Sequence, residues 1–358
     1  MRMIISAGGT GGHIYPGVAV AREFLARDAS GEVLFVGTAR GLETTIVPRE
    51  GFRLETLEAA ALKGVSMVKR LTSLARLPKG FLEALGILRR FKPDVVVGVG
   101  GYASGPILLM ASLSRYPTMV IEPNAMPGFT NRVLARFVRA AAVTFEESLA
   151  WFGKRGVVTG NPVRSDFVGL AKKQRGDRTH LLVFGGSQGS RALNNAMIAA
   201  LPHLAEAIGA GRLTITHQTG PREHDVVRDA YAAAGVDADV RPYIDRMVDA
   251  FAEADLLLCR AGATTVAEVA VAGKAAIFVP FPQAADDHQR KNAEAFVRAG
   301  AGRMLLERDL TGERVAREIL DLGGDPVAID RMEDASRALA RTDAAARAVD
   351  LAMSLVKA

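Results

Sequence analysis

The stretch MIISAGGTGGHIYPG, residues 3–17, decides how the chain begins to fold. A short apolar run, typical of a buried strand, leads into glycines at positions 8, 9, 11 and 12, and a helical pattern follows. Glycine loses more conformational freedom on folding than any other residue, so this density predicts that another group comes close to the backbone. A glycine turn that enters a helix also exposes N–H groups at the positive end of the helix dipole, which suits phosphate.

A second stretch, LLVFGGSQGSR at residues 181–191, has the same order of apolar strand, glycine loop and helix. Apolar strands alternate with helical patterns along the whole chain, which predicts parallel sheets covered by helices on both faces. A length of 358 residues is typical of about two domains. We therefore predict two similar α/β domains, each opening on a glycine loop, with a ligand cleft between them. The charged stretch LAKKQRGDRTH, residues 170–180, lies between the halves and is predicted to be a linker or an exposed turn.

The composition restricts the partners without choosing one. The formal net charge of +6 and the pI near 9.6 favour an anionic partner, such as nucleic acid, a phospholipid surface or a phosphorylated substrate. The single cysteine, Cys259, excludes an internal disulfide, favours a reducing compartment and is predicted to be buried in a strand. Residues 95–114 carry no charge, but their glycines and Pro106 predict a strand, a loop and a helix that starts after Gly105 instead of a membrane span.

Two motifs leave alternatives open. GVGGYA, residues 98–103, matches the dinucleotide fingerprint, and Glu122 follows near the spacing expected for a ribose contact, which would suit an NAD-dependent oxidoreductase. In CRAGATTVAE, residues 259–268, Thr265 and Glu268 have the spacing of a capping box, in which Glu268 only satisfies a backbone N–H. Glu268 could equally accept hydrogen bonds from two hydroxyls of a ribose.

Metal chemistry is weakly indicated. Asp237 and Asp239 form a D-x-D pair of the kind that holds a divalent ion in some sugar transferases. They lie in the predicted turn VDADV without a third ligand nearby, so we interpret them as turn residues and predict no metal site. Without a metal, helix N-termini and cations such as Arg164 would have to balance the charge of a departing phosphate.

Several stretches, taken together and in order, resemble the MurG family of bacterial glycosyltransferases. They are GGTGGHIYPG (8–17), GVGGYASGP (98–106), EPNAMPGFTNR (122–132), GNPVR (160–164), GGSQGSR (185–191), CRAGATTVAE (259–268) and PFPQAADDHQRKNA (280–293). That family transfers N-acetylglucosamine from UDP-N-acetylglucosamine to the undecaprenyl-diphosphate-linked N-acetylmuramoyl pentapeptide, converting lipid I to lipid II in peptidoglycan synthesis. Pro123 and Ser190 depart from the family, in which glutamine and alanine are frequent at these positions. A UDP-N-acetylglucosamine epimerase or another lipid glycosyltransferase of the same fold would share the donor-side stretches.

The resemblance implies an α/β fold of the GT-B class, with two Rossmann-like domains and a cleft between them, and inversion at the anomeric carbon without a metal or another cofactor. The N-terminal domain, residues 1–161, would face the acceptor and the membrane. The C-terminal domain, residues 162–341, would bind UDP-N-acetylglucosamine, and a last helix, residues 342–358, would cross back to the first domain. The implied binding site for the donor, UDP-N-acetylglucosamine, consists of Thr10, Gly11, Gly12, Asn124, Arg164, Ser187, Ile244, Ala263, Thr264, Thr265, Val266, Ala267, Glu268 and Gln289, with Tyr102 on the acceptor side.

The resemblance also implies partners and a location. The partners would be UDP-N-acetylglucosamine, the lipid-linked muramoyl peptide and an anionic membrane surface, with no nucleic acid. The protein would be peripheral on the cytoplasmic face of the bacterial cell membrane. Residues 63–92 mix cations with apolar residues on both sides of Pro78. This pattern predicts two basic amphipathic helices, broken at Pro78, that could lie on an anionic bilayer, and ordinary helices packed on the sheet are the alternative.

Inversion requires a base that removes the proton of the attacking hydroxyl. His13 is our candidate for the catalytic base, because an imidazole at a helix N-terminus is held neutral and can accept a proton. The alternative is that His13 only caps or orients the glycine loop.

Overall fold

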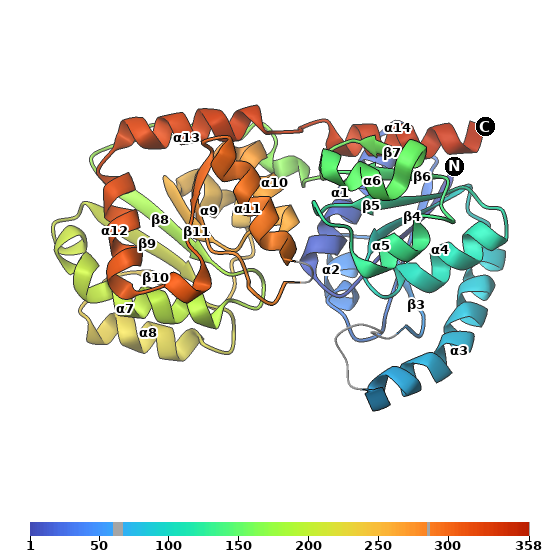
Figure 1. Cartoon of the computed structure of the whole chain (residues 1–358), viewed down its shortest axis with the longest axis horizontal. Helices are drawn as coiled ribbons and strands as arrows, with labels where there is room; N and C mark the ends of the chain where they lie inside the picture. The colour runs from blue at the N-terminus through green and yellow to red at the C-terminus, as the bar shows by residue number, and fades with distance from the viewer. Residues whose placement is uncertain (60–66, 285–286, 358) are drawn as a thin grey trace. The chain divides into compact units, whose positions relative to one another are not determined.

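A computed structural model describes the backbone of residues 1–59, 67–284 and 287–357, and their side chains apart from those of 67–77 and 357. The chain forms two compact units (Figure 1). Unit 1 is Met1–Ser165 with Arg341–Ala358, and unit 2 is Asp166–Ala340. Each unit contains one parallel sheet with helices packed on it, which confirms the predicted fold class.

Unit 1 is built on a seven-stranded sheet in the order β3-β2-β1-β4-β5-β6-β7. Its strands are β1 (Arg2–Ala7), β2 (Glu32–Gly37), β3 (Arg53–Thr56), β4 (Val95–Gly100), β5 (Thr118–Glu122), β6 (Ala140–Val143) and β7 (Gly156–Val158). β1 pairs in parallel with both β2 and β4, and β4 is buried along its whole length. The glycine loops that follow β1 and β4 therefore lie side by side at the carboxyl edge of the sheet.

Helices cover both faces of this sheet. The helices on one face are α1 (Gly11–Arg27), α2 (Glu43–Arg49) and α14 (Ala344–Lys357). The helices on the other face are α3 (Met67–Phe91), α4 (Ser104–Leu113), α5 (Phe129–Leu134) and α6 (Leu149–Phe152). The C-terminal helix α14 contacts α1 and the strands β4, β5 and β6, and its Val349 is fully buried. This helix therefore contributes to the core of unit 1 (Figure 1).

Unit 2 is built on a six-stranded sheet in the order β10-β9-β8-β11-β12-β13. Its strands are β8 (Thr179–Phe184), β9 (Leu213–Gln218), β10 (Asp239–Arg241), β11 (Leu256–Cys259), β12 (Ala275–Phe278) and β13 (Gly302–Met304). Its helices are α7 (Arg191–Gly209), α8 (His224–Ala233), α9 (Met247–Glu253), α10 (Ala263–Ala272), α11 (His288–Arg298), α12 (Gly312–Gly323) and α13 (Pro326–Ala338). The apolar face expected for α7, which includes Leu193, Met197 and Leu204, is buried in the main core of this unit.

Three short strands were not expected from the sequence. They are β3, β7 and β13, and each is the edge strand of its sheet. Most of their residues are half-exposed, so they lack the continuous apolar run by which the central strands are recognised.

Two helix boundaries differ from the prediction. α3 continues through Pro78 as one helix, so the predicted break is wrong: the proline ring removes one hydrogen bond, and the turns on either side continue. α4 begins at Ser104 and not after Gly105, because Pro106 lies in the first turn, where an N–H has no helical partner to lose. In the part of the chain that the structure describes, no helix combines the length and the apolar composition needed to cross a membrane.

The stretch at residues 170–180 does not link the two halves, because unit 2 already begins at Asp166. Six of its residues are exposed and residues 171–176 have no regular structure, in agreement with the alternative prediction of an exposed turn. Arg175 pairs with Glu333 at 2.7 Å, and Lys173 pairs with Asp255 at 2.7 Å. Both carboxylates are almost fully buried, and a buried charge needs such a partner. The stretch is therefore anchored within unit 2.

In unit 2, a chain of hydrogen bonds joins buried polar side chains next to the glycine loop at residues 185–191. Asn194 Nδ2 donates to Thr219 O at 3.0 Å, which leaves Asn194 Oδ1 to accept from His217 Nε2 at 3.1 Å. The hydroxyl of Tyr231 then donates to His217 Nδ1 at 3.1 Å. His217 is fully buried, and the loss of hydration lowers its pKa to about 3. The imidazole is therefore neutral in the folded protein.

This lowered pKa predicts a loss of stability in mild acid. Below pH 6.5 the unfolded chain protonates His217 while the folded chain does not, so the free energy of unfolding falls with pH between the two pKa values. Between pH 7 and pH 5 we expect wild type to lose about 2 kcal/mol more than His217→Gln in urea unfolding. His203→Gln, which removes an exposed histidine of α7, should follow wild type. Equal losses in wild type and His217→Gln would contradict the prediction.

Candidate functional site

The first glycine loop, residues 8–13, connects β1 to α1. Gly9 has a φ of +90°, and a Cβ at this position would meet no described atom within 4 Å. Thr10 is the N-cap residue of α1, and its carbonyl accepts from His13 N–H at 3.1 Å. Thr10 Oγ1 lies 3.4 Å from His13 Nδ1. If Nδ1 carries the proton and donates to Thr10, Nε2 is the nitrogen that can accept a proton.

The glycine loop after β4, residues 98–103, packs directly against the glycine loop after β1. A Cβ at Gly101 would lie 2.4 Å from Gly8 O, and a Cβ at Gly100 would lie 2.9 Å from Cδ2 of His13. In a dinucleotide fingerprint the second glycine lets the backbone approach a pyrophosphate. Here that glycine is Gly100, and the imidazole of His13 occupies its free side. The dinucleotide interpretation of this motif is therefore wrong.

The predicted acceptor-side residue Tyr102 follows these glycines, and its side chain is half exposed. Arg164, predicted to contact the donor, places its guanidinium over the ring of Tyr15, with Cζ 4.6 Å from the ring centroid. A Cβ at Gly11 would lie 3.3 Å from the same ring. Tyr15 thus brings Arg164 to the first turn of α1, which begins with Gly11 and Gly12.

Glu43, the first residue of α2, is a further residue of this site that the sequence pattern does not reveal. Its side chain is fully buried, and its carboxylate accepts from Gly9 N–H at 2.9 Å and from Thr38 N–H at 2.8 Å. The hydroxyl of Thr38 donates to the same carboxylate at 2.7 Å. Gly37 and Gly41, which both precede Glu43, are the only local signal of this arrangement among the described residues. They do not reveal the contact with the distant Gly9.

Glu122 also differs from its predicted role. It is buried, and its carboxylate accepts from the backbone N–H groups of Asn124 at 2.9 Å and Gly128 at 3.0 Å and from Asn131 Nδ2 at 2.9 Å. Desolvation raises its pKa, and these hydrogen bonds oppose that rise. Glu122 therefore holds the loop that carries Asn124, and it is not placed to contact a ribose. Asn124 Nδ2 donates to the same carboxylate at 3.2 Å.

The glycine loop of unit 2, residues 185–191, connects β8 to α7 and carries Ser187. A Cβ at Gly189 would lie 1.9 Å from Thr219 O, so this loop packs against the loop that follows β9. The side chain of Ser190, one of the departures from the family, caps α7 by accepting from Leu193 N–H at 3.4 Å.

Gln218, which the sequence did not single out, connects two predicted donor contacts. Its Nε2 donates to Gly186 O at 2.9 Å, and its Oε1 accepts from Ile244 N–H at 2.9 Å. One side-chain amide therefore holds the loop of Ser187 and the buried Ile244 at a set separation.

The α10 helix begins with the residues predicted to line the donor site. Its N-cap residue is Gly262, which brings no side chain to the N–H groups of the first turn. Thr265 is the third residue of the helix and not its N-cap, so the capping-box interpretation of Thr265 and Glu268 is wrong. Glu268 lies in the second turn and is 7% exposed. The side chain of Val266 is buried, and its N–H donates to Gly262 O at 2.9 Å. The side chain and the N–H of Val266 therefore both make their contacts within unit 2. The other predicted residues in these two turns are Ala263, Thr264 and Ala267.

Two further contacts join the loops around α10 and α11. Asn292 Nδ2 donates to Ala261 O at 3.1 Å, and Arg260 Nη1 donates to Val279 O at 3.1 Å. The predicted Gln289, on α11, accepts from Phe281 N–H at 3.0 Å through its Oε1. The amide nitrogen of Gln289 can then donate to a ligand.

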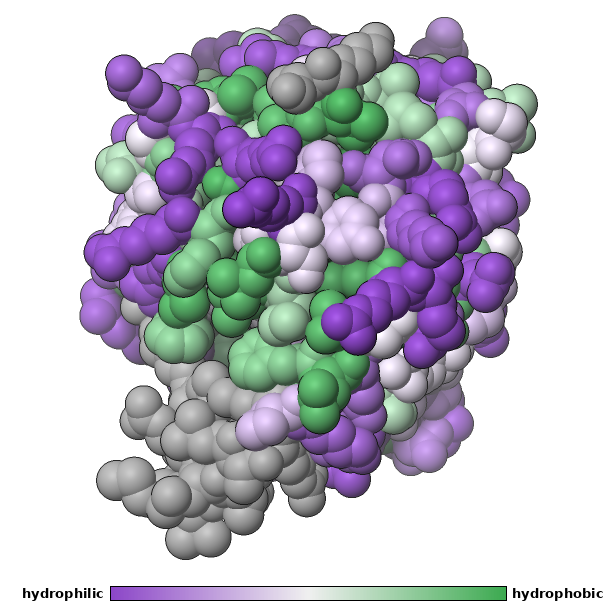
Figure 2. All heavy atoms as spheres, turned by 90° about the vertical axis from the view of Figure 1, so that its right-hand side faces the viewer, coloured by the Kyte–Doolittle hydropathy of each residue, from purple (hydrophilic) through white to green (hydrophobic). Residues whose placement is uncertain are grey.

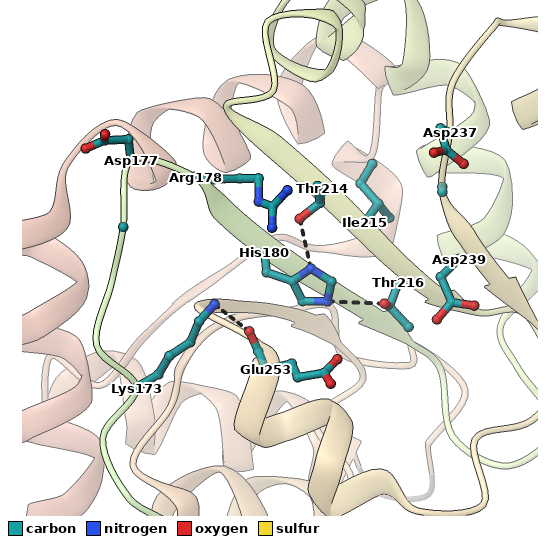
Figure 3. A pocket seen from close by; sticks show the side chains of 12 residues that line it. Lys173, Asp177, Arg178, His180, Thr214, Ile215, Thr216, Asp237, Asp239 and Glu253 are labelled. Atoms are coloured by element: carbon teal, nitrogen blue, oxygen red, sulfur yellow. Dashed lines mark hydrogen bonds between the residues drawn. The ribbon is translucent and has the colours of Figure 1, made fainter.

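A separate cavity of about 730 Å³ in unit 2 contains none of the predicted site residues (Figure 3). Its floor includes His180, whose two ring nitrogens lie 2.9 Å from Thr214 Oγ1 and 3.1 Å from Thr216 Oγ1. Asp237 and Asp239 line one side, and Asp239 is paired with Arg241 at 2.7 Å. Asp239 is the first residue of β10, so its interpretation as a turn residue is wrong. Within residues 1–59, 67–284 and 287–357, no group of three or more histidine, cysteine or acidic side chains is arranged to hold a metal ion.

Comparison with known proteins identifies the family. The model of the glycosyltransferase family 28 N-terminal domain matches residues 3–143, and that of the C-terminal domain matches residues 180–348. A protein of Geotalea daltonii is 48% identical over 355 residues, which cover 98% of this chain and 96% of the relative. A protein of Anaeromyxobacter dehalogenans is 50% identical over 362 residues, which cover 100% and 94%. Both relatives are named UDP-N-acetylglucosamine--N-acetylmuramyl-(pentapeptide) pyrophosphoryl-undecaprenol N-acetylglucosamine transferase.

Solved structures agree with this assignment. The crystal structure of Acinetobacter baumannii MurG is 30% identical, with a TM-score of 0.78 and coverage of 99% of both chains. A UDP-GlcNAc 2-epimerase from Neisseria meningitidis shares the fold, with a TM-score of 0.71 at 13% identity and coverage of 99% of this chain and 100% of that one. The chain therefore belongs to glycosyltransferase family 28, and within it to the MurG family.

Proposed function

We propose that this protein transfers N-acetylglucosamine from UDP-N-acetylglucosamine to the undecaprenyl-diphosphate-linked N-acetylmuramoyl pentapeptide, with inversion at the anomeric carbon. The observation that carries this proposal is an identity of 48–50% with relatives named for that transfer, over 96–100% of the chain. An NAD-dependent oxidoreductase is not supported, since His13 fills the position where the fingerprint would admit a pyrophosphate. The likeness to epimerases concerns the fold alone.

We propose that unit 2 binds the donor. The first N–H groups of α10 and the glycine loop before α7 are suited to the diphosphate of UDP, because helix N-termini attract anions. Glu268 would accept hydrogen bonds from the ribose hydroxyls, and Gln289 would donate through its Nε2. Gln218 would hold the loop of Ser187 and the backbone of Ile244 in the positions needed to contact the same ligand.

We propose that unit 1 receives the acceptor, with His13 as the catalytic base. The acceptor hydroxyl would attack the anomeric carbon of N-acetylglucosamine as the bond from that carbon to the diphosphate oxygen breaks. The proton of the hydroxyl would pass to His13 Nε2, and the bonding electron pair would leave with UDP. Thr10 would hold the imidazole in the required tautomer through Nδ1. Arg164, kept at the first turn of α1 by Tyr15, offers a cation for the developing charge on UDP.

We also propose that unit 1 lies on an anionic membrane surface. Lys63 of the segment first considered for this role lies outside the described residues, as do the side chains of 67–77. Two described cations of the segment are paired with acidic residues, Lys79 with Glu58 at 2.6 Å and Arg90 with Glu55 at 2.7 Å. The support therefore comes from the neighbouring helices of the same layer.

The surface of α4, α5 and the turn that follows α5 combines exposed apolar side chains with arginines. Leu113 is 63% exposed, and Phe129, Val133 and Phe137 are each nearly half exposed. Arg132 lies on α5, and Arg115, Arg136 and Arg139 follow the two helices. The one acidic residue within 104–145 is the buried Glu122, and the exposed Glu146 and Glu147 come directly after this range. Figure 2 shows apolar surface among hydrophilic side chains on the side of the chain where α3 and α4 lie in Figure 1. Apolar insertion together with arginine attraction is typical of peripheral binding to anionic lipid.

The direct test of the proposed reaction is transfer of labelled N-acetylglucosamine to the lipid-linked muramoyl acceptor, with a metal chelator present. A labelled disaccharide lipid is the expected product. Release of an epimerised sugar, or no product with an acceptor that a characterised member of the family uses, would reject the proposed function.

Replacing Glu268 should weaken donor binding. Glu268→Ala removes hydrogen bonds from an ionised acceptor, each of which contributes about 1.5–3 kcal/mol, so the Kd for UDP measured by calorimetry should rise about 10- to 100-fold. Glu294→Ala removes a carboxylate of α11 that is paired with Arg290, and it should bind UDP as wild type does. A Glu268→Ala protein with the wild-type Kd would remove this residue from the donor site.

Replacing His13 should separate catalysis from donor binding. His13→Gln is expected to lower kcat about 10²- to 10⁴-fold, the usual effect of losing a general base, while the Kd for UDP stays within twofold. The control is His203→Gln, for which turnover should match wild type. Unchanged turnover in His13→Gln would limit His13 to orienting the loop.

Membrane binding should depend on α5, which carries Val133, and on the turn after it, which carries Phe137. Sedimentation with phosphatidylglycerol vesicles is expected at low salt and should weaken at high salt, because arginine attraction is screened. Val133→Asp with Phe137→Asp should abolish it, whereas Val226→Asp, at an exposed position of α8, should leave it unchanged. Absence of wild-type binding at low salt, or undiminished binding of the double variant, would reject the proposed surface.

A further inference from the structure

The Glu43 carboxylate is enclosed by backbone that cannot carry side chains. A Cβ at Gly41 would lie 1.9 Å from Glu43 Oε2, a Cβ at Gly37 would lie 2.5 Å from Glu43 Cγ, and a Cβ at Gly8 would lie 2.8 Å from Glu43 Oε1. Real Cβ atoms do not approach other atoms this closely, so each of these positions must be glycine for Glu43 to occupy its place. We call Gly8, Gly37, Gly41 and Thr38 the Glu43 cage.

Both carboxylate oxygens of Glu43 must accept hydrogen bonds. Glu43 Oε2 accepts from Gly9 N–H, and Oε1 accepts from the N–H and the hydroxyl of Thr38. A carboxylate provides acceptors only, whereas a glutamine would turn an NH₂ group toward one of these donors. Burial makes that mismatch costly, because a buried donor without an acceptor keeps its full desolvation penalty.

The cage is connected to His13 through the backbone. Gly9 N–H is fixed by Glu43, Thr10 follows Gly9 directly, and Thr10 holds His13 through its carbonyl and its hydroxyl. Gly9 has a φ of +90°, and no described atom lies within 4 Å of the position that its Cβ would occupy. The orientation of the Gly9 peptide is therefore set by its hydrogen bond to Glu43 and not by side-chain packing.

We propose that Glu43 is the positioning residue that sets the first glycine loop, and with it His13, for attack by the acceptor hydroxyl. This inference rests on the proposed function, since it assigns a support to the base of that reaction. Glu43 reaches the loop from α2 and does not touch the reacting atoms; it acts through Gly9 and Thr10. Misplacement of a reacting group by about 1 Å costs about 100-fold in rate, so the cage has a kinetic role as well as a structural one.

The test compares Glu43→Gln with Glu50→Gln, which removes the half-buried carboxylate just beyond α2 that pairs with Arg22. Glu43→Gln should lower kcat for transfer about 10- to 100-fold and leave the Kd for UDP unchanged. Glu50→Gln should transfer at the wild-type rate. The amide of Gly9 should exchange with solvent faster in Glu43→Gln than in wild type, a readout that does not depend on activity.

A double-mutant cycle decides whether Glu43 acts through His13. In a His13→Gln background, Glu43→Gln should cost less than twofold in kcat, because the group that it positions is already lost. The same loss in both backgrounds, or a wild-type kcat in Glu43→Gln, would overturn the inference. If Glu43→Gln does not fold, Thr38→Val decides instead: it removes only the hydroxyl bond and should lower kcat severalfold, and a wild-type rate would overturn the inference. Wild-type protein that transfers no sugar would reject the proposed function, whereas an active wild type with an equally active Glu43→Gln would reject only the role of Glu43.

Discussion

Both units depend on close backbone contact between neighbouring loops at the carboxyl edge of a parallel sheet. In unit 1 the loop after β1 touches the loop after β4, where a Cβ at Gly101 would collide with Gly8 O. In unit 2 the loop after β8 touches the loop after β9, where a Cβ at Gly189 would collide with Thr219 O. Glycine at these contacts allows two loops to approach more closely than side chains permit, and a compact set of polar backbone groups results.

Buried polar side chains of different kinds hold these loops in place through hydrogen bonds. Glu43 and Glu122 in unit 1 are carboxylates that collect backbone N–H groups. His217 and Gln218 in unit 2 are neutral side chains that both donate and accept. Each of these groups is satisfied inside the protein, so it orders the loop without competing for a ligand.

The buried strands and the amphipathic helices were predictable because buried positions are occupied by apolar residues at regular spacing in the sequence. β4 and β11 are continuous apolar runs, and α7 has its apolar residues at helical spacing. The edge strands β3, β7 and β13 were missed because half-exposed strands carry no such run. Only the linker interpretation of residues 170–180 was wrong, because ion pairs with carboxylates more than 80 positions away in the chain hold this exposed stretch on unit 2.

The sequence by itself determined the class of fold, the two glycine loops and the likeness to one glycosyltransferase family, since these depend on residues that are near one another in the chain. Tertiary structure alone decided which groups the glycines admit. Gly8 admits the carboxylate of Glu43 and Gly100 admits the ring of His13, and both contacts join positions that are far apart in the sequence. It also decided that Glu268 does not cap its helix, because α10 begins at Ala263, before the apparent capping box. The physical reason is the same in each case: hydrogen bonds and close contacts depend on distances in space, which local sequence patterns do not record.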